Sequence, residues 1–542
     1  MTTKSRLFYA GTTLALLLMG AAEAAAQHDM HGAESREDGA VPLYDGLGTL
    51  SRAITTPEPE AQAYFDQGLR LTYGFGHSEA ARSFREAIRR DASCAMCYWG
   101  VAWARGPYLN AGRDSASIVE AYEAIGEARR LARRADGASE VERALIEAMA
   151  VRYEASPDME RQAPLDSAYA DAMRDVVRRF PHDLDAATLY GEALMVLRPW
   201  DHWTRDGLPQ PGTEDVLAIL ESVLGRDIAH PGACHLYVHA VEASPGPERA
   251  EACAELLGDA IPMASHVPHM PSHIWMRIGR YGDAVRANQR AWHADQMAVL
   301  GRGVPIYPTH NLQMLLTAGS MDGQSAVAWQ AAKDLGRISR ASVFYESLVL
   351  ARFGRWDDVL DLSEAPESAF QRGIWRHARG LAHLRKGAAD SARIHLDSID
   401  ALIAATPDTL RFRDHRQTDL LGIARGILAG ELFAAAGRHD EAVRALEAAL
   451  PLEDSLKYDE PEPWITPVRH VLGAVLLEAG RPADAERVYR AALADHRENG
   501  WSLYGLEGAL RRQGRAAEAD EVQARFERAW IRSDTWLTSS RF

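Results

Sequence analysis

The sequence predicts an all-α fold, in which antiparallel helix pairs stack into an elongated solenoid. The chain has 542 residues, which is more than one compact domain holds, so several domains or a repeat array are expected. No long segment alternates with the period of two that a β-strand requires. Glycine–arginine pairs recur where turns between antiparallel helices are expected, at Gly279-Arg280, Gly354-Arg355, Gly437-Arg438, Gly480-Arg481 and Gly514-Arg515.

Small and bulky residues recur along the chain at fixed spacings. The first set is Phe65, Gly68, Leu71, Ala80, Phe84 and Ala87. Similar sets follow at Gly380, Ala392 and Leu396, at Gly430, Ala442, Leu446 and Ala449, and at Gly473, Ala485, Tyr489 and Ala492. Ala485 and Ala519 are 34 residues apart, which is the period of a tetratricopeptide repeat (TPR). We therefore expect a TPR-like solenoid over residues 61–311 and further TPR units over residues 312–542.

Three proline-rich segments interrupt this pattern. They run from Pro199 to Pro211, from Gly301 to Pro308 and from Pro451 to Pro467, and proline cannot occupy a helix interior without loss of a hydrogen bond. We expect them to be insertions between repeats. The first contains Trp200-Asp201-His202-Trp203, and tryptophans on a loop favour a ligand contact or a lid, with packing against the next helix as an equal alternative.

The first 26 residues have the three parts of a secretory signal. Lys4 and Arg6 precede an apolar run from Leu7 to Gly20, and Ala24–Ala26 provide a cleavage site. The run is shorter than the roughly 18 residues of a membrane-spanning helix, and no later stretch is long and apolar enough. We expect an exported protein, periplasmic or extracellular.

Residues 27–60 are rich in Gly, Pro, Glu and Ala without helical periodicity and are expected to be flexible.

The charge excludes some partners. The formal net charge is −16, from 60 basic and 76 acidic residues. Nucleic acids and anionic membranes need a basic surface, so neither is an expected partner. The sequence also lacks a Gly-Lys dipeptide, hence a P-loop, and a G-x-G-x-x-G motif after a strand. TPR arrays bind other proteins, so a protein or peptide partner in the concave groove is expected.

The most informative residues are two histidine pairs. Ala250 and Ala284 are 34 residues apart and align two consecutive repeats, which places His235 on His269 and His239 on His273. Each pair has the i, i+4 spacing that puts two imidazoles on one helix face, where they can share a metal ion. The alignment predicts that all four histidines face the groove from neighbouring helices.

Further side chains belong to the same candidate site. Glu242 lies seven residues after His235, which places it on the same helix face. It is a candidate metal ligand or general base. His266 and, after one insertion, His310 are additional candidates. Imidazole ligands suit Zn, Cu, Ni or Fe better than Mg or Ca. The site is not of the H-E-x-x-H type, because Leu236 stands where that motif has Glu. Two alternatives remain: histidines copied by repeat duplication without a function, and histidines that clamp a peptide.

Two weaker features involve other metal-binding residues. His28, Met30 and His31 suit loose binding of copper or nickel, although histidines in a short tail commonly have no function. The four cysteines are expected to form disulfides in an oxidising compartment, Cys94 with Cys97 and Cys234 with Cys253 across a helix turn. For Cys94 and Cys97, a metal or haem ligand is the alternative, but Tyr98 occupies the position where c-type haem attachment needs His.

Several strings resemble a known family. They are FDQGLRLTYGFGHSEAARSFREA, CAMCYWG, LRPWDHWT, HPGACHLYVHAVEASPGPERA and HMPSHIWMRIGRYGDAV, and they lie between Phe65 and Asn311. They look like secreted bacterial TPR proteins, with more distant similarity to the eukaryotic TPR protein 38. The resemblance implies the fold and export, and no activity.

Two hypotheses of function follow. In the first, the chain is an exported scaffold that holds a protein or peptide in its groove. In the second, it is a metalloprotein in which the four aligned histidines bind one or two transition-metal ions, either for catalysis or for metal storage and delivery.

Overall fold

The structure, a computed structural model of the chain, describes residues 41–110, 114–155 and 161–542. The expected secretory signal and the candidate residues His28, Met30 and His31 lie outside these ranges. The described residues form two compact units, which we call the N-terminal unit (residues 41–311) and the C-terminal unit (residues 312–542).

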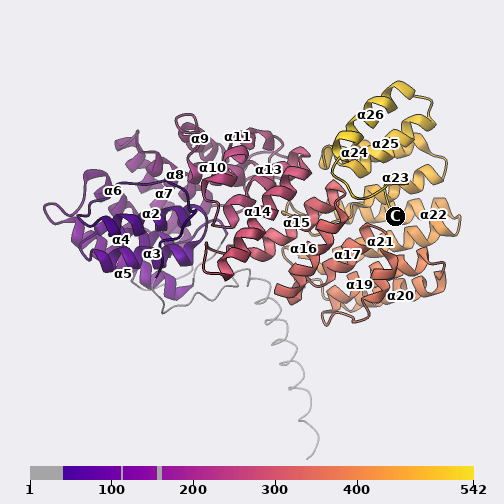
Figure 1. The fold of residues 1–542 in the computed structure, drawn as a ribbon, viewed down its shortest axis with the longest axis horizontal. Coiled ribbons are helices and arrows are strands. Elements are labelled where there is room, and N and C mark those ends of the chain that lie inside the picture. The colour runs from indigo at the N-terminus through magenta and orange to yellow at the C-terminus, as the bar shows by residue number, and fades with distance from the viewer. Residues whose placement is uncertain (1–40, 111–113, 156–160) are drawn as a thin grey trace, which may run out of the picture. The chain divides into compact units, whose positions relative to one another are not determined.

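Helices build both units (Figure 1). The N-terminal unit contains α2 (Pro59–Tyr73), α3 (His77–Arg90), α4 (Ala95–Ala104), α5 (Ser115–Ala132), α6 (Glu140–Ala150), α7 (Gln162–Arg179), α8 (Leu184–Val196), α9 (Thr213–Leu224), α10 (Pro231–Val241), η2 (Pro247–Ala250), α11 (Glu251–Ala260), α12 (His266–His269), α13 (Pro271–Ile278) and α14 (Tyr281–Val299). Helix α15 (Pro308–Asp322) contains the boundary between the units.

The C-terminal unit contains α16 (Ser325–Ile338), η3 (Arg340–Ser342), α17 (Phe344–Arg352), α18 (Trp356–Asp361), α19 (Ala369–Arg385), α20 (Ala389–Ala405), α21 (Gln417–Ala435), α22 (His439–Asp454), α23 (Val468–Glu478), α24 (Pro482–Asp495), α25 (Gly500–Arg512) and α26 (Ala516–Ala529). Two-residue strands β1 (Arg411–Phe412) and β2 (His415–Arg416) pair antiparallel before α21. Consecutive helices pack as antiparallel pairs, α2 on α3, α19 on α20, α21 on α22 and α25 on α26. The all-α, TPR-like fold is confirmed.

Glycine and aromatic residues explain why the helices pack so closely. The buried ring of Phe84 on α3 lies between Gly68 on α2 and Gly100 on α4, and a Cβ atom at either glycine would overlap the ring. Tyr489 on α24 lies in the same way between Gly473 on α23 and Gly505 on α25. In these two places, therefore, absence of a side chain on two flanking helices makes room for one large ring.

The glycine–arginine turns have the backbone that their sequence predicts. Gly279, Gly354, Gly437, Gly480 and Gly514 all have positive φ angles, between 67° and 84°. A residue with a Cβ atom is strained in this left-handed conformation, which ends a helix and lets the chain reverse. The turns thus depend on glycine itself.

Residues 41–58 correct one expectation. They form no helix, but they are held by specific contacts and are not a flexible segment. The Arg52 guanidinium lies 2.7 Å from Asp183 and 3.0 Å from Asp185, and the Ser51 hydroxyl donates to Asp66 at 2.7 Å. The expectation failed because it used local composition, whereas two of these partners are more than 130 positions away.

The proline-rich segments differ in one case from what we expected. The first segment lies outside the helices. The second also does, except that its last residue, Pro308, begins α15. Pro451, however, lies inside the last turn of α22, so the third insertion begins after Asp454. Proline at this position leaves the carbonyl of Glu447 without its usual helix donor, and only three more helical residues follow it.

Two disulfides are present. Cys94 is bonded to Cys97 at the start of α4, and Cys234 on α10 is bonded to Cys253 on α11. The second links two antiparallel helices next to the histidine pairs. Among the described residues, no helix is long and apolar enough to cross a membrane.

Candidate metal centre

Helices α10, α12 and α13 and the first turn of α15 position the candidate residues. Helix α10 carries His235 and His239, with Glu242 directly after its last residue. His266 and His269 form the ends of α12, and α13 carries His273. The backbone stays helical at Met270 between α12 and α13, so the i, i+4 spacing of His269 and His273 still places them on one face. His310 lies in the first turn of α15.

The structure brings all of these side chains together. Possible donor atoms of His235, His239 and His266 lie within 4.8 Å of one another, and the same holds for His269, His273 and His310. A third such group joins the two, because Glu242 lies within this distance of His239 and His273. We call the six histidines and Glu242 the histidine centre, and the two groups of three the first and the second triad.

The centre is buried beneath aromatic side chains. His235, His239, His266, His269 and His273 are at most 3% exposed, whereas His310 is partly exposed. The ring of Phe75, from the turn after α2, lies 4.2 Å from that of His235 and stacks on His239 and His266 at 5.6 Å between centroids. Tyr307 meets His266 edge-on at 5.0 Å. These histidines therefore do not form an open surface that a peptide could contact.

Each aligned histidine has one ring nitrogen held by an acceptor. Nδ1 of His235 lies 2.5 Å from the Tyr73 carbonyl oxygen, and Nδ1 of His269 lies 2.6 Å from the Asn288 amide oxygen. One carboxylate oxygen of Glu242 lies 3.0 Å from Nδ1 of His239. The other oxygen is in contact with Nδ1 of His273. Acceptors at Nδ1 place the hydrogen there, which leaves Nε2 of each ring with a lone pair.

The Nε2 atoms are the donors left to the centre. Within the described part of the chain, Nε2 of His235 and of His239 has no hydrogen-bond partner, and neither nitrogen of His266 has one. Nε2 of His269 lies 2.7 Å from Nε2 of His273. Two lone pairs at this distance repel each other unless a cation or a proton lies between them. This geometry is the one that histidine ligands of metal ions have, with an outer acceptor that fixes each ring.

Burial also keeps these rings uncharged. It lowers the pKa of His235, His266 and His269 well below the usual histidine range, and neighbouring imidazoles lower it further. Burial lowers the pKa of His239 too, against the opposing effect of Glu242. Burial by itself would raise the pKa of Glu242, but the adjacent His273 and His239 outweigh it and lower this pKa. His235, His266 and His269 are thus neutral imidazoles near neutral pH, and Glu242 is a carboxylate.

The loop with two tryptophans covers one side of the centre. Trp200 is half exposed, and its ring meets His239 edge-on at 5.1 Å. Trp203 donates its indole N–H to the Ala240 carbonyl at 2.7 Å, so it packs on α10. Packing against a helix, which is one of the two alternatives from the sequence, thus applies to Trp203. His202 between them is buried, and burial together with the nearby His239 lowers its pKa to about 4.

Sequence reasoning missed the supporting residues. Tyr73 is the last residue of α2, Phe75 lies in the turn after it, and Asn288 lies on α14. Nothing in the spacing of the histidines points to these residues. In the sequence, His202 stands out only as part of the Trp200–Trp203 segment.

Comparisons with known proteins find no relative in sequence and only distant similarity to solved structures. No family model matches the chain, and no curated protein matches it in sequence. Among solved structures, the human IFIT1 dimer with m7Gppp-AAAA is 11% identical with a TM-score of 0.31, over 88% of this chain and 91% of that one. Cut9 in the APC/C Cut9–Hcn1 hetero-tetramer assembly is 13% identical with a TM-score of 0.30, over 95% and 81%. The Naa15/Naa10 structure bound to HypK-THB is 13% identical with a TM-score of 0.21, over 87% and 73%.

Fold and site together define a class: a TPR-like helical-repeat protein with a buried histidine centre in its N-terminal unit.

Proposed function

We propose that this chain is an exported TPR-like metalloprotein whose histidine centre binds transition-metal ions. The observation that carries the proposal is the arrangement of four rings. Nδ1 of His235, His239, His269 and His273 lies against an acceptor, and donor atoms of these rings gather with those of His266 and His310 in two groups of three. Histidines copied without a function, or used only as core residues, would have no reason to leave Nε2 of His235 and of His239 without a partner among the described residues, because each buried unsatisfied group costs about 1–3 kcal/mol.

The donors favour particular metals. Neutral imidazole nitrogen suits Zn, Cu, Ni and Fe, whereas Mg and Ca need oxygen ligands. Each histidine triad leaves a coordination position open, as in catalytic sites, where three protein ligands and a water hold the ion. The two disulfides support export, because such bonds form and persist in oxidising compartments.

Elemental analysis tests the metal. We expect the full chain, purified without a histidine tag, to contain at least one equivalent of Zn, Cu, Ni or Fe after dialysis against buffer. The double variant His269→Ala/His273→Ala removes the closest pair of donors and should lose metal. The matched control His182→Ala/His293→Ala changes two exposed histidines and should keep it. A metal-free wild-type protein, or equal metal in both variants, contradicts the proposal.

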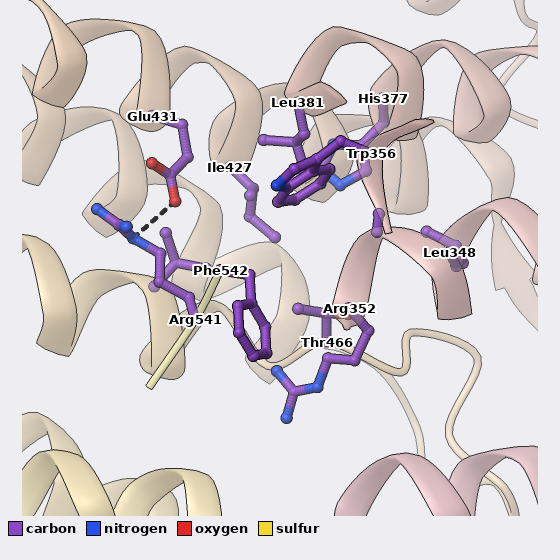
Figure 2. A pocket seen from close by; sticks show the side chains of 12 residues that line it. Leu348, Arg352, Trp356, His377, Leu381, Ile427, Glu431, Thr466, Arg541 and Phe542 are labelled. Atoms are coloured by element: carbon purple, nitrogen blue, oxygen red, sulfur yellow. Dashed lines mark ion pairs between the residues drawn. The ribbon is translucent and has the colours of Figure 1, made fainter. Parts of the chain in front are cut away.

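A second candidate function, binding of a peptide, concerns the C-terminal unit. Residues 533–542 lie across the first helices of its helix pairs. The Ser540 hydroxyl donates to the His470 carbonyl on α23 at 2.7 Å, Arg541 lies 2.7 Å from Glu431 on α21, and Arg385 on α19 donates to the Phe542 oxygen at 2.8 Å. Figure 2 shows the Phe542 ring in a pocket with Arg352, Ile427 and Thr466. A segment of the chain thus sits where a TPR-like array would hold a peptide.

A peptide titration tests this candidate. Because it is tethered, the resident segment has an effective concentration of order mM and should exclude an added copy of itself. We expect a labelled peptide of residues 534–542 to bind the variant Phe542→Ala at least tenfold more tightly than it binds the wild type. A peptide in which Arg541 and Phe542 are replaced by Glu and Ala is the control and should bind neither. Equal binding of the first peptide to both proteins, or no binding to the variant, counts against a peptide site here.

A further inference from the structure

We propose that the histidine centre holds two metal ions side by side, one in each triad. His235, His239 and His266 hold the first ion, and His269, His273 and His310 hold the second. This inference rests on the metal-binding function proposed above.

The arrangement of donors favours two ions over one. The six imidazoles do not gather around a single point, since donor atoms within 4.8 Å of one another form two sets of three. A structural zinc site has four ligands, so a single ion would leave two of the six rings unused. A catalytic zinc ion is held by three protein ligands, with nitrogens at about 2.0–2.1 Å. Each triad supplies three such nitrogens.

His266 and His310 complete the triads. His266 is 1% exposed, and neither of its nitrogens has a hydrogen-bond partner among the described residues. Its ring lies 5.0 Å from that of His235 and 6.0 Å from that of His239. The ring of His310 lies 4.6 Å from that of His269 and 5.6 Å from that of His273. Each triad thus joins an i, i+4 pair to one histidine from another turn of chain.

The two triads are linked and close together. Glu242 gives one oxygen to His239 of the first triad and the other to His273 of the second. The rings of these two histidines lie 5.5 Å apart, as do those of His266 and His269. One carboxylate therefore orients one ligand of each ion. The two ions would be close enough to interact.

The charges identify the kind of ligand that the pair would take. Two divalent ions bring four positive charges, and the donor sets named here supply only the single negative charge of Glu242. Three protein ligands leave an open position on each ion. A small oxygen ligand such as hydroxide, bridging both ions, would add negative charge and fill both positions, as in known two-metal sites.

Copper titration of the full chain tests the inference. All proteins carry His28→Ala and His31→Ala, so that the amino-terminal histidines add no copper. Apo protein is loaded with Cu²⁺, passed over a desalting column, and measured by elemental analysis and electron paramagnetic resonance. We expect two equivalents in the parent, and one in each of the single variants His266→Ala and His310→Ala. We also expect less resonance signal per copper at two equivalents than at one, because neighbouring Cu²⁺ ions couple.

The outcomes separate the two proposals. No retained copper in the parent contradicts metal binding as a whole. One equivalent in the parent overturns the two-ion centre and leaves metal binding standing. Two equivalents with a full signal per copper, or two equivalents in either folded single variant, also overturn it. Circular dichroism confirms folding, and the parent's stoichiometry and signal decide the matter even if a variant fails to fold.

Discussion

Replacement of Glu242 by Gln is expected to weaken metal binding by about 10–100-fold, although it removes no imidazole. The carboxylate accepts Nδ1–H from His239 and is in ion-pair contact with Nδ1 of His273. An amide has one acceptor oxygen and an NH2 group that cannot accept, so at least one ring loses the bond that fixes its orientation. Competition with a chelator of known affinity measures the change in the metal dissociation constant.

The control for this substitution is Glu251→Gln, the same chemical change at a half-exposed carboxylate paired with Arg280. Unchanged affinity in Glu242→Gln would show that Glu242 does not orient the rings. Loss of one whole equivalent, with the other bound as in the wild type, would show instead that Glu242 is itself a ligand, which is the other role that the sequence suggested.

The second large effect concerns stability. Phe84→Ala is expected to lower the free energy of unfolding by about 3–5 kcal/mol, because it empties a fully buried site. The gap would be hard to close, since Gly68 and Gly100 on the two flanking helices have no side chains to move into it. Urea unfolding followed by circular dichroism measures the loss.

Phe180→Ala provides the comparison, because Phe180 is only partly buried at the end of α7 and should cost much less. Gly100→Ala should also destabilise the protein, since the added methyl group would overlap the Phe84 ring. If Phe84→Ala and Phe180→Ala have equal effects, the ring between two glycines is not what holds these helices together.

The repeat pattern was readable from the sequence because its causes are local. Gly68 and Phe84, or Gly473 and Tyr489, are 16 residues apart on two consecutive helices, and their contact depends on one turn between them. The same regularity let two repeats be aligned and the four histidines be placed at equivalent positions. Residue spacing within a helix and between adjacent helices carries this information directly.

The supporting contacts of the centre could not be read in this way. The acceptor of His235 is a backbone carbonyl 162 positions away, and Phe75 reaches three histidines from the turn after α2. The order in residues 41–58 likewise comes from Asp183 and Asp185.

Sequence spacing therefore determined the fold class and which histidines are equivalent. Tertiary structure decided which contact holds Nδ1 of each aligned histidine, that five of the six rings are buried and that the six form two triads. The physical reason is that hydrogen-bond direction and burial depend on atoms brought together from distant parts of the chain, about which the local pattern of residues carries no information.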